Sequence, residues 1–183
     1  MIIIDSFLET TYPQLKAHSK TCEFGDVENP IDGVVYPHIC LDVPQDVVDE
    51  LYWFLGAVIS RKIKDPLTFM RMSPKGAAAP HKFHNDSSHG KYSMMLYLED
   101  NDDAGTGLAQ HKKTEAIRPA NDILQEVIRD QNLDEEWFVY KVAKMRENRA
   151  VIFDSSLFHV ALPIGGYGEK QEDSRIVLTT FFS

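Results

Sequence analysis

Three histidines and one aspartate lie within nine positions of the chain, in the segment APHKFHNDSSHGKY at residues 79–92. Imidazole and carboxylate groups are common ligands of divalent transition metals. His84 and Asp86 form the only His-x-Asp pair in the sequence, and residues two apart on extended backbone point to the same side. These two side chains can therefore converge on one metal ion. His81 would face the other way and His89 follows in a turn, so both are expected to flank the site or to face a substrate.

A third metal ligand has to come from another part of the chain. Two histidines and one carboxylate form the facial set that leaves three adjacent positions of an octahedral Fe(II) open. His159 lies between the apolar residues Phe158 and Val160, and a buried imidazole requires a partner. From the residues alone, two interpretations stay open: a metal ligand, or a core histidine bonded to a backbone carbonyl.

The order of these residues resembles that of the Fe(II)/2-oxoglutarate-dependent oxygenase superfamily, and in particular its prolyl-hydroxylase-like branch. The family pattern is His-x-Asp, then a strand ending in Tyr-Leu, then a histidine with proline four residues later, then an arginine on the next strand. This sequence has His-x-Asp at 84–86, Tyr97-Leu98, His159 with Pro163, and Arg175. The resemblance covers residues 67–183.

For the metal, the resemblance implies that His84, Asp86 and His159 hold Fe(II). The co-substrate 2-oxoglutarate would chelate this iron, and O₂ would take the remaining position.

For the co-substrate, the resemblance implies that Arg175 pairs with the distal carboxylate of 2-oxoglutarate, with Tyr97 and Thr179 donating hydrogen bonds. The strand phases agree, because Tyr97 shares a face with Ser93, and Thr179 shares a face with Arg175. A buried carboxylate requires a cation, and arginine offers two N–H groups in a planar fork.

The spacing between His159 and Arg175 departs from the family pattern. It is longer than usual, and the extra residues are IGGYGEKQEDS at 164–174. If this loop bulges out between two strands, the ligands are undisturbed and the loop is placed to cover the site mouth. If the strand boundaries shift instead, the role of Arg175 fails.

Regular elements must position these side chains. Proline and acidic residues near its start, with an apolar stripe along it, predict a helix over 44–63. A second helix is expected over 119–130, where the apolar period becomes 3.6. Strands are expected at 2–8, 66–72, 92–98, 105–113, 135–145, 148–155, 157–163 and 174–182.

This order of elements predicts a mainly β (α+β) fold with an antiparallel sandwich or barrel-like core. With the resemblance, the expected architecture is a double-stranded β-helix (jelly roll, cupin-like) with an N-terminal helix packed outside and a helical insertion. We expect one domain over residues 1–183. Residues 1–65 would support a core at 66–183, with the insertion at about 112–146.

Composition limits the partners. The formal charge of −9 disfavours nucleic acid, which is bound largely through clustered lysine and arginine. The two cysteines, Cys22 and Cys40, are too few for a disulfide framework, so we expect free thiols. The apolar run at the start is too short for a signal peptide or a membrane span. We therefore expect a cytoplasmic protein without a membrane partner.

The predicted activity is that of a dioxygenase that hydroxylates a C–H bond and decarboxylates 2-oxoglutarate to succinate. The expected substrate is a peptidyl or amino-acid side chain or a small metabolite. We expect two loops, 73–80 and 165–174, to contact it. Arg71 is a further candidate for substrate contact, although a solvated surface arginine is the simpler interpretation of this residue. Two alternatives stay open: a cupin-like metalloenzyme that does not use 2-oxoglutarate, and a non-catalytic binding protein on the same fold.

Overall fold

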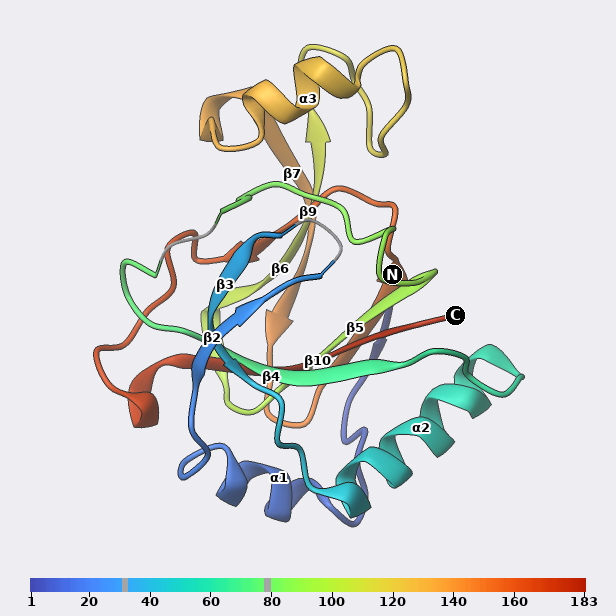
Figure 1. Cartoon of the computed structure of the whole chain (residues 1–183), viewed down its shortest axis with the longest axis vertical. Helices are drawn as coiled ribbons and strands as arrows, with labels where there is room; N and C mark the ends of the chain where they lie inside the picture. Colours follow the sequence, from blue (N-terminus) through green and yellow to red (C-terminus); the bar gives the residue numbers. More distant parts are fainter. Residues whose placement is uncertain (31–32, 78–79) are drawn as a thin grey trace.

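The computed structural model describes residues 1–30, 33–77 and 80–183. In this part of the chain, the strands form two antiparallel sheets (Figure 1). The larger sheet has the order β1 (Ile2–Ile4), β8 (Ala150–Asp154), β5 (Tyr92–Tyr97), β10 (Arg175–Phe182), β4 (Leu67–Ser73), β3 (Val35–Cys40) and β2 (Gly25–Glu28). The smaller sheet has the order β7 (Trp137–Met145), β6 (Asn101–His111) and β9 (His159–Leu162). This arrangement confirms the predicted mainly β, jelly-roll fold class.

The larger sheet has two apolar faces because its strands alternate. On β5, Met94 and Leu96 pack toward the helices, whereas Tyr97 packs between the sheets against residues of β6 and β7. Alternation of this kind is typical of a strand buried on both sides. The face between the two sheets is the one that holds the predicted site residues.

Two helices, α1 (Tyr12–His18) and α2 (Gln45–Ile59), cover the outer face of the larger sheet (Figure 1). Helix α2 buries Val47, Leu51 and Leu55, which are four residues apart and so lie on one face of the helix. It ends before Arg61, earlier than predicted, because Ser60 adopts a left-handed conformation with φ of 55°. None of the described helices has both the length and the apolarity that a bilayer crossing requires.

The third helix, α3 (Leu124–Asp130), lies at the opposite end of the molecule from α1 and α2 (Figure 1). It starts five residues after the predicted 119, following turns and irregular backbone. Its Val127 packs with Trp137 and Phe158 in a separate apolar cluster. Residues 112–136 leave the sheet, whereas β7, which the sequence placed inside the insertion, pairs with β6. Single turns of 3-10 helix occur at η1 (Asp134–Glu136) and η2 (Gln171–Asp173).

Candidate active site

The backbone brings the two predicted histidines side by side. His84 and His159 form an isolated antiparallel bridge, in which each N–H donates to the other residue's carbonyl, at 3.1 and 2.9 Å. The Asp86 N–H donates to the Ser155 carbonyl at 2.8 Å. The segment 84–86 is thereby held against the chain that leads into β9, and its two side chains point to the same side.

The three side chains converge on one point. The Nε2 atom of His159 lies 3.0 Å from Oδ2 of Asp86, and that of His84 lies 3.6 Å from Oδ1. Ligands that bind one transition metal at about 2.0–2.2 Å, in adjacent octahedral positions, lie roughly 3 Å apart. One ligand atom from each residue falls within 4.8 Å of the other two. The donor set and its spacing therefore fit a divalent metal ion.

Backbone carbonyls orient both imidazole rings. Nδ1 of His159 lies 3.0 Å from the Leu157 carbonyl, and Nδ1 of His84 lies 3.2 Å from the Lys82 carbonyl. A carbonyl at Nδ1 is the usual partner that fixes the ring of a metal-binding histidine and leaves Nε2 for the ion. The Leu157 carbonyl alone also fits the alternative of a core histidine. The metal-ligand interpretation is favoured by Nε2 of His159, which faces the Asp86 carboxylate.

The charges of Asp86 and His84 suit metal binding, whereas the Asp86 carboxylate favours a protonated His159, which must lose its proton to bind a metal. Burial, with His159 nearby, lowers the pKa of His84 to about 4, so this ring is neutral near pH 7. Burial would raise the pKa of Asp86, but the two histidines outweigh it and hold that pKa well below its ordinary value. Burial would lower the pKa of His159, but the Asp86 carboxylate outweighs it and raises that pKa. An ionised carboxylate and a neutral imidazole are the forms that bind a metal.

The triad forms part of the wall of a cavity between the sheets. The other polar side chains in its wall include Arg71 and Ser73 from β4, Arg175 and Thr179 from β10, and Thr106 from β6. Arg175 stands opposite Ser73 in the β10–β4 ladder, and Thr179 stands opposite Met95 in the β10–β5 ladder. The structure thus brings two of the three predicted co-substrate residues, Arg175 and Thr179, into the same cavity as the triad.

Arg175 is buried without a carboxylate partner. It is 3% exposed, its Nη2 donates to the Gly105 carbonyl at 3.3 Å, and its Nε has no hydrogen-bond partner. Within the described ranges, no carboxylate lies at ion-pair distance from it. Burial lowers the pKa of this guanidinium, yet arginine stays charged in proteins. A buried cation of this kind is available for an anionic ligand.

Tyr97 lies on the face between the sheets, as its strand phase predicts, but it is not part of the cavity wall. Its hydroxyl is buried 2.8 Å from Oγ1 of Thr106 and 3.2 Å from the Ala143 carbonyl. Tyr97 is not among the residues in the cavity wall, whereas Thr106 is. The sequence analysis missed Thr106, although its position between two glycines on an expected strand was a usable signal.

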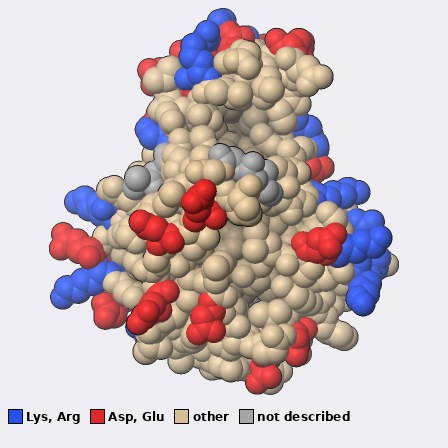
Figure 2. Space-filling model, in the orientation of Figure 1, with Lys and Arg blue, Asp and Glu red and all other residues tan. Residues whose placement is uncertain are grey.

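Arg71 is not the solvated surface residue of the simpler interpretation, because it lines the cavity. Burial lowers the pKa of its guanidinium, and the Asp86 carboxylate opposes this effect. Its guanidinium carbon lies 6.0 Å from the centre of the Tyr36 ring. The cavity therefore contains two arginines, although the surface drawn in Figure 2 shows acidic side chains over its middle and lower parts and basic ones mostly at its edges.

The long connection between His159 and Arg175 bulges out of the sheets and leaves both residues in their strands. Its Ile164, Gly165 and Gly166 line the cavity. It is tied to the 73–76 turn, where the Gly76 N–H donates to the Gly165 carbonyl and the Lys75 N–H to the Gly168 carbonyl. Ala78 and Ala79 of the predicted contact loop 73–80 lie outside the described residues.

The two other histidines of the 79–92 segment, His81 and His89, have different surroundings. His81 lines the cavity, which agrees with a position facing a substrate. His89 stacks on Phe181, with ring centroids 4.9 Å apart, and so flanks the site.

No model of a known protein family matches this sequence, and no curated protein matches it. Solved structures do resemble the fold. A prolyl hydroxylase from Trichoplax adhaerens, in complex with a hypoxia inducible factor peptide fragment, matches with a TM-score of 0.58 and 15% identity over 99% of this chain and 82% of its own. HygX from Streptomyces hygroscopicus, with nickel and 2-oxoglutarate bound, matches with a TM-score of 0.57 and 12% identity over 98% and 80%.

A prolyl-4-hydroxylase from Pseudomonas putida also matches, with a TM-score of 0.52 and 13% identity over 99% of this chain and 90% of its own. At such identities the likeness establishes a common fold. The resemblance to prolyl-hydroxylase-like oxygenases is therefore confirmed at the level of the fold.

Proposed function

We propose that this protein is an Fe(II)- and 2-oxoglutarate-dependent dioxygenase that hydroxylates a C–H bond of its substrate. One observation carries the proposal: the His84, Asp86 and His159 ligand atoms lie within 4.8 Å of one another in a cavity that also holds the unpaired Arg175. A fold shared with HygX, whose structure holds nickel and 2-oxoglutarate, supports the same cofactors.

His84, Asp86 and His159 would hold the iron from one side, which leaves its other side open to the cavity. Bound iron and 2-oxoglutarate would supply the oxidative decarboxylation, with O₂, that yields succinate and CO₂. Arg175 would bind the distal carboxylate through its guanidinium, and the Thr179 hydroxyl would donate a further hydrogen bond. Burial of these groups excludes water and strengthens both interactions.

The direct test is conversion of 2-oxoglutarate to succinate by the purified protein in the presence of O₂. We expect slow succinate formation without added substrate, dependent on Fe(II) and abolished by a chelator. Iron-dependent O₂ consumption without loss of 2-oxoglutarate would favour the cupin-like alternative, and no turnover with any candidate substrate would favour a binding protein.

We propose that the substrate carries a negative charge, because Arg71 supplies the cavity with a second cation. The Trichoplax neighbour binds a peptide fragment, so a peptidyl or amino-acid carboxylate and a small anionic metabolite are the two classes to test. The acidic exterior disfavours nucleic acid.

Replacing Arg71 with methionine tests this division of labour between the two arginines. We expect the KM for 2-oxoglutarate in substrate-free turnover to change less than about threefold, because Arg71 would bind the substrate and not 2-oxoglutarate. Loss of a charged hydrogen bond to 2-oxoglutarate itself would cost about 1.5–3 kcal/mol, which is tenfold and more. The stimulation of turnover by anionic substrate candidates should be lost. If the 2-oxoglutarate KM rose as much as it is expected to rise when Arg175 is replaced with methionine, Arg71 would instead be assigned to the co-substrate.

Replacing Tyr97 with phenylalanine tests whether this tyrosine acts directly or through Thr106. Its hydroxyl lies on Thr106 and on the Ala143 carbonyl, so we expect a loss of about 1 kcal/mol in the free energy of unfolding. The KM for 2-oxoglutarate should change only slightly. T106V removes the same contact from the other side and is the matched control. A tenfold rise of the KM in Y97F alone would show that Tyr97 reaches the co-substrate itself.

A further inference from the structure

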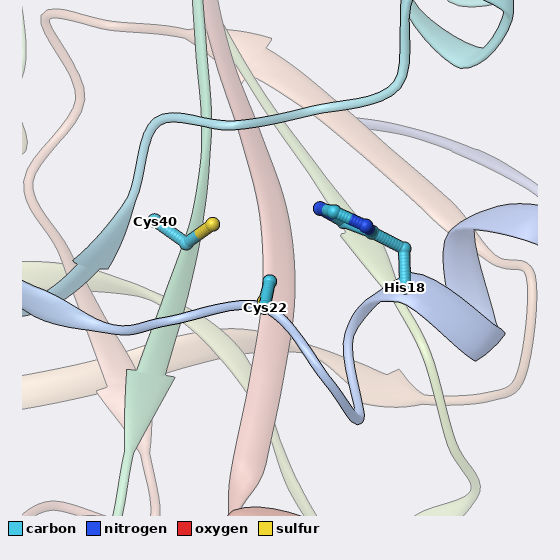
Figure 3. Close-up of side chains that lie close together, drawn as sticks. All are labelled: His18, Cys22 and Cys40. Atoms are coloured by element: carbon cyan, nitrogen blue, oxygen red, sulfur yellow. The ribbon is translucent and has the colours of Figure 1, made fainter.

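A second group of metal-binding side chains lies outside the cavity. His18, Cys22 and Cys40 each offer one ligand atom, and these three atoms lie within 4.8 Å of one another. Figure 3 shows the Cys40 sulfur pointing toward His18, with Cys22 between the two residues. They come from the end of α1, from the segment that follows it, and from the end of β3.

The positions of these side chains are fixed by the fold. Cys22 and Cys40 are buried, and the Cys22 N–H donates to the His18 carbonyl at 2.9 Å, which continues the last turn of α1. The Asp42 carbonyl lies 2.6 Å from Nε2 of His18 and 3.4 Å from the Cys40 sulfur. One backbone group therefore lies within reach of both the imidazole and a thiol.

The chemistry of the group favours a soft or borderline divalent cation. Zinc binds cysteine sulfur at about 2.3 Å and histidine nitrogen at about 2.0–2.1 Å, so tetrahedral ligands lie roughly 3.4–3.8 Å apart. The ligand atoms of His18, Cys22 and Cys40 are at most 4.8 Å apart. They would therefore reach tetrahedral spacing with movements of about an ångström or less. Burial and the neighbouring Cys40 raise the pKa of Cys22 to about 12, so this buried thiol becomes a thiolate only when a cation balances it.

We propose that His18, Cys22 and Cys40 form a structural zinc site. The fourth position would be taken by water, or by the exposed Asp42 carboxylate if it turns inward, since its Oδ2 lies 3.9 Å from Nε2 of His18. Two thiolates neutralise the ion, which makes the site compatible with its buried position. The sequence spacing His-x₃-Cys at 18–22 places both residues on the last turn of α1 and its extension.

The site would also hold one end of the loop at the cavity mouth. Nε2 of Gln171 donates to the Ser19 and Cys22 carbonyls, at 2.9 and 3.0 Å. Gln171 belongs to η2 in the 164–174 loop, whose first residues line the cavity. A metal that fixes the 18–22 segment would therefore fix the anchor point of this loop.

Cobalt(II) tests the site without interference from the cavity triad, because only cysteine ligation produces thiolate-to-cobalt charge-transfer absorption. The chain has two cysteines, and the triad has none. We expect Co(II) in excess of both sites, added to the reduced, metal-free protein, to produce this absorption. C22S and C40S should each weaken it strongly, and D86N should leave it unchanged.

His18 gives the decisive variant, because it is only partly buried and its replacement is compatible with folding. H18A should weaken Co(II) binding by more than the roughly 10- to 100-fold that loss of an outer partner of a metal ligand costs. H38N, which removes the other histidine of this region, is the matched control and should bind normally. Zn²⁺ should raise the Tm of the D86N protein, in which His18, Cys22 and Cys40 are intact, and should not raise the Tm of the D86N/H18A double variant.

Absence of charge-transfer absorption in folded, reduced protein would overturn the proposal. An absorption that is equal in H18A and in the unaltered protein would overturn it as well, as would a disulfide between Cys22 and Cys40 that persists under reducing conditions. None of these results bears on the cavity triad.

Discussion

Replacing Asp86 with asparagine is expected to abolish tight Fe(II) binding and to lower 2-oxoglutarate turnover by at least about 100-fold. The reason is that Asp86 would supply the only anionic ligand of the proposed triad, and it lies between the two histidines, 3.0 and 3.6 Å from their Nε2 atoms. Loss of an outer partner of a metal ligand already costs about 10- to 100-fold in affinity or activity, and loss of a ligand costs more. Metal binding is measured by equilibrium dialysis and turnover by succinate formation.

Two control variants belong with D86N. Asp103→Asn makes the same chemical change at an exposed carboxylate on β6 and should retain full metal binding. Ser93→Ala removes a hydroxyl 3.4 Å from Oδ2 of Asp86 and should cost about 10-fold, the lower end of the range for an outer partner, because this hydrogen bond is long. If D86N bound Fe(II) as tightly as D103N, the triad assignment would be wrong.

Replacing Arg175 with methionine is expected to raise the KM for 2-oxoglutarate by about 100-fold and to leave Fe(II) binding intact. A charged hydrogen bond contributes about 1.5–3 kcal/mol, and a bidentate pair contributes more. The KM of the Arg175→Lys variant should lie between that of the unaltered protein and that of R175M, because lysine keeps the charge and lacks the planar fork. The measurements are substrate-free succinate formation against 2-oxoglutarate concentration and Fe(II) binding by dialysis.

The stability of R175M separates a role in ligand binding from a role in folding. Without ligand, Arg175 is a buried cation with an unpartnered Nε and one hydrogen bond to Gly105, so its replacement by an apolar side chain should keep or raise the Tm. A fall of several degrees in Tm, with an unchanged KM, would show that Arg175 supports the fold rather than the co-substrate.

The metal-binding half of the site could be predicted from the sequence because it depends on local geometry. Extended backbone places His84 and Asp86 on one side, and an apolar strand with one histidine demands a partner for His159. The pairing of His84 with His159 through an isolated bridge is a long-range contact that local pattern does not contain; only the resemblance brought these residues together.

For the predicted co-substrate residues Arg175, Thr179 and Tyr97, strand phase was informative only in part. Phase predicts which face a side chain occupies, and Arg175 and Thr179 do line the cavity. It does not predict where a long side chain ends, and so the Tyr97 hydroxyl lies on Thr106. The predicted role of Tyr97 in co-substrate binding therefore stays a prediction. The simpler interpretation of Arg71, a solvated surface residue, was wrong for a related reason. The sequence of one strand does not show that a second sheet covers it, and Arg71 lines the cavity between the sheets.

The N-terminal part was the least predictable. Helix α1 and strands β2 and β3 were not foreseen, because prolines interrupt residues 9–45 and each element is only four to seven residues long. Helix α1 is stabilised by packing on the larger sheet, and β2 and β3 are stabilised by pairing at its edge. Sequence periodicity over so few residues cannot reveal such long-range contacts.

The most direct measurement is anaerobic addition of Fe(II) and 2-oxoglutarate to the metal-free protein, followed by visible absorption spectroscopy. Chelation of triad-bound iron by 2-oxoglutarate should produce a weak charge-transfer band that is absent with Fe(II) alone and absent in D86N. R175M should show the band only at much higher 2-oxoglutarate concentrations. No band in the unaltered protein at saturating concentrations, or a band that persists unchanged in D86N, would contradict the proposed function.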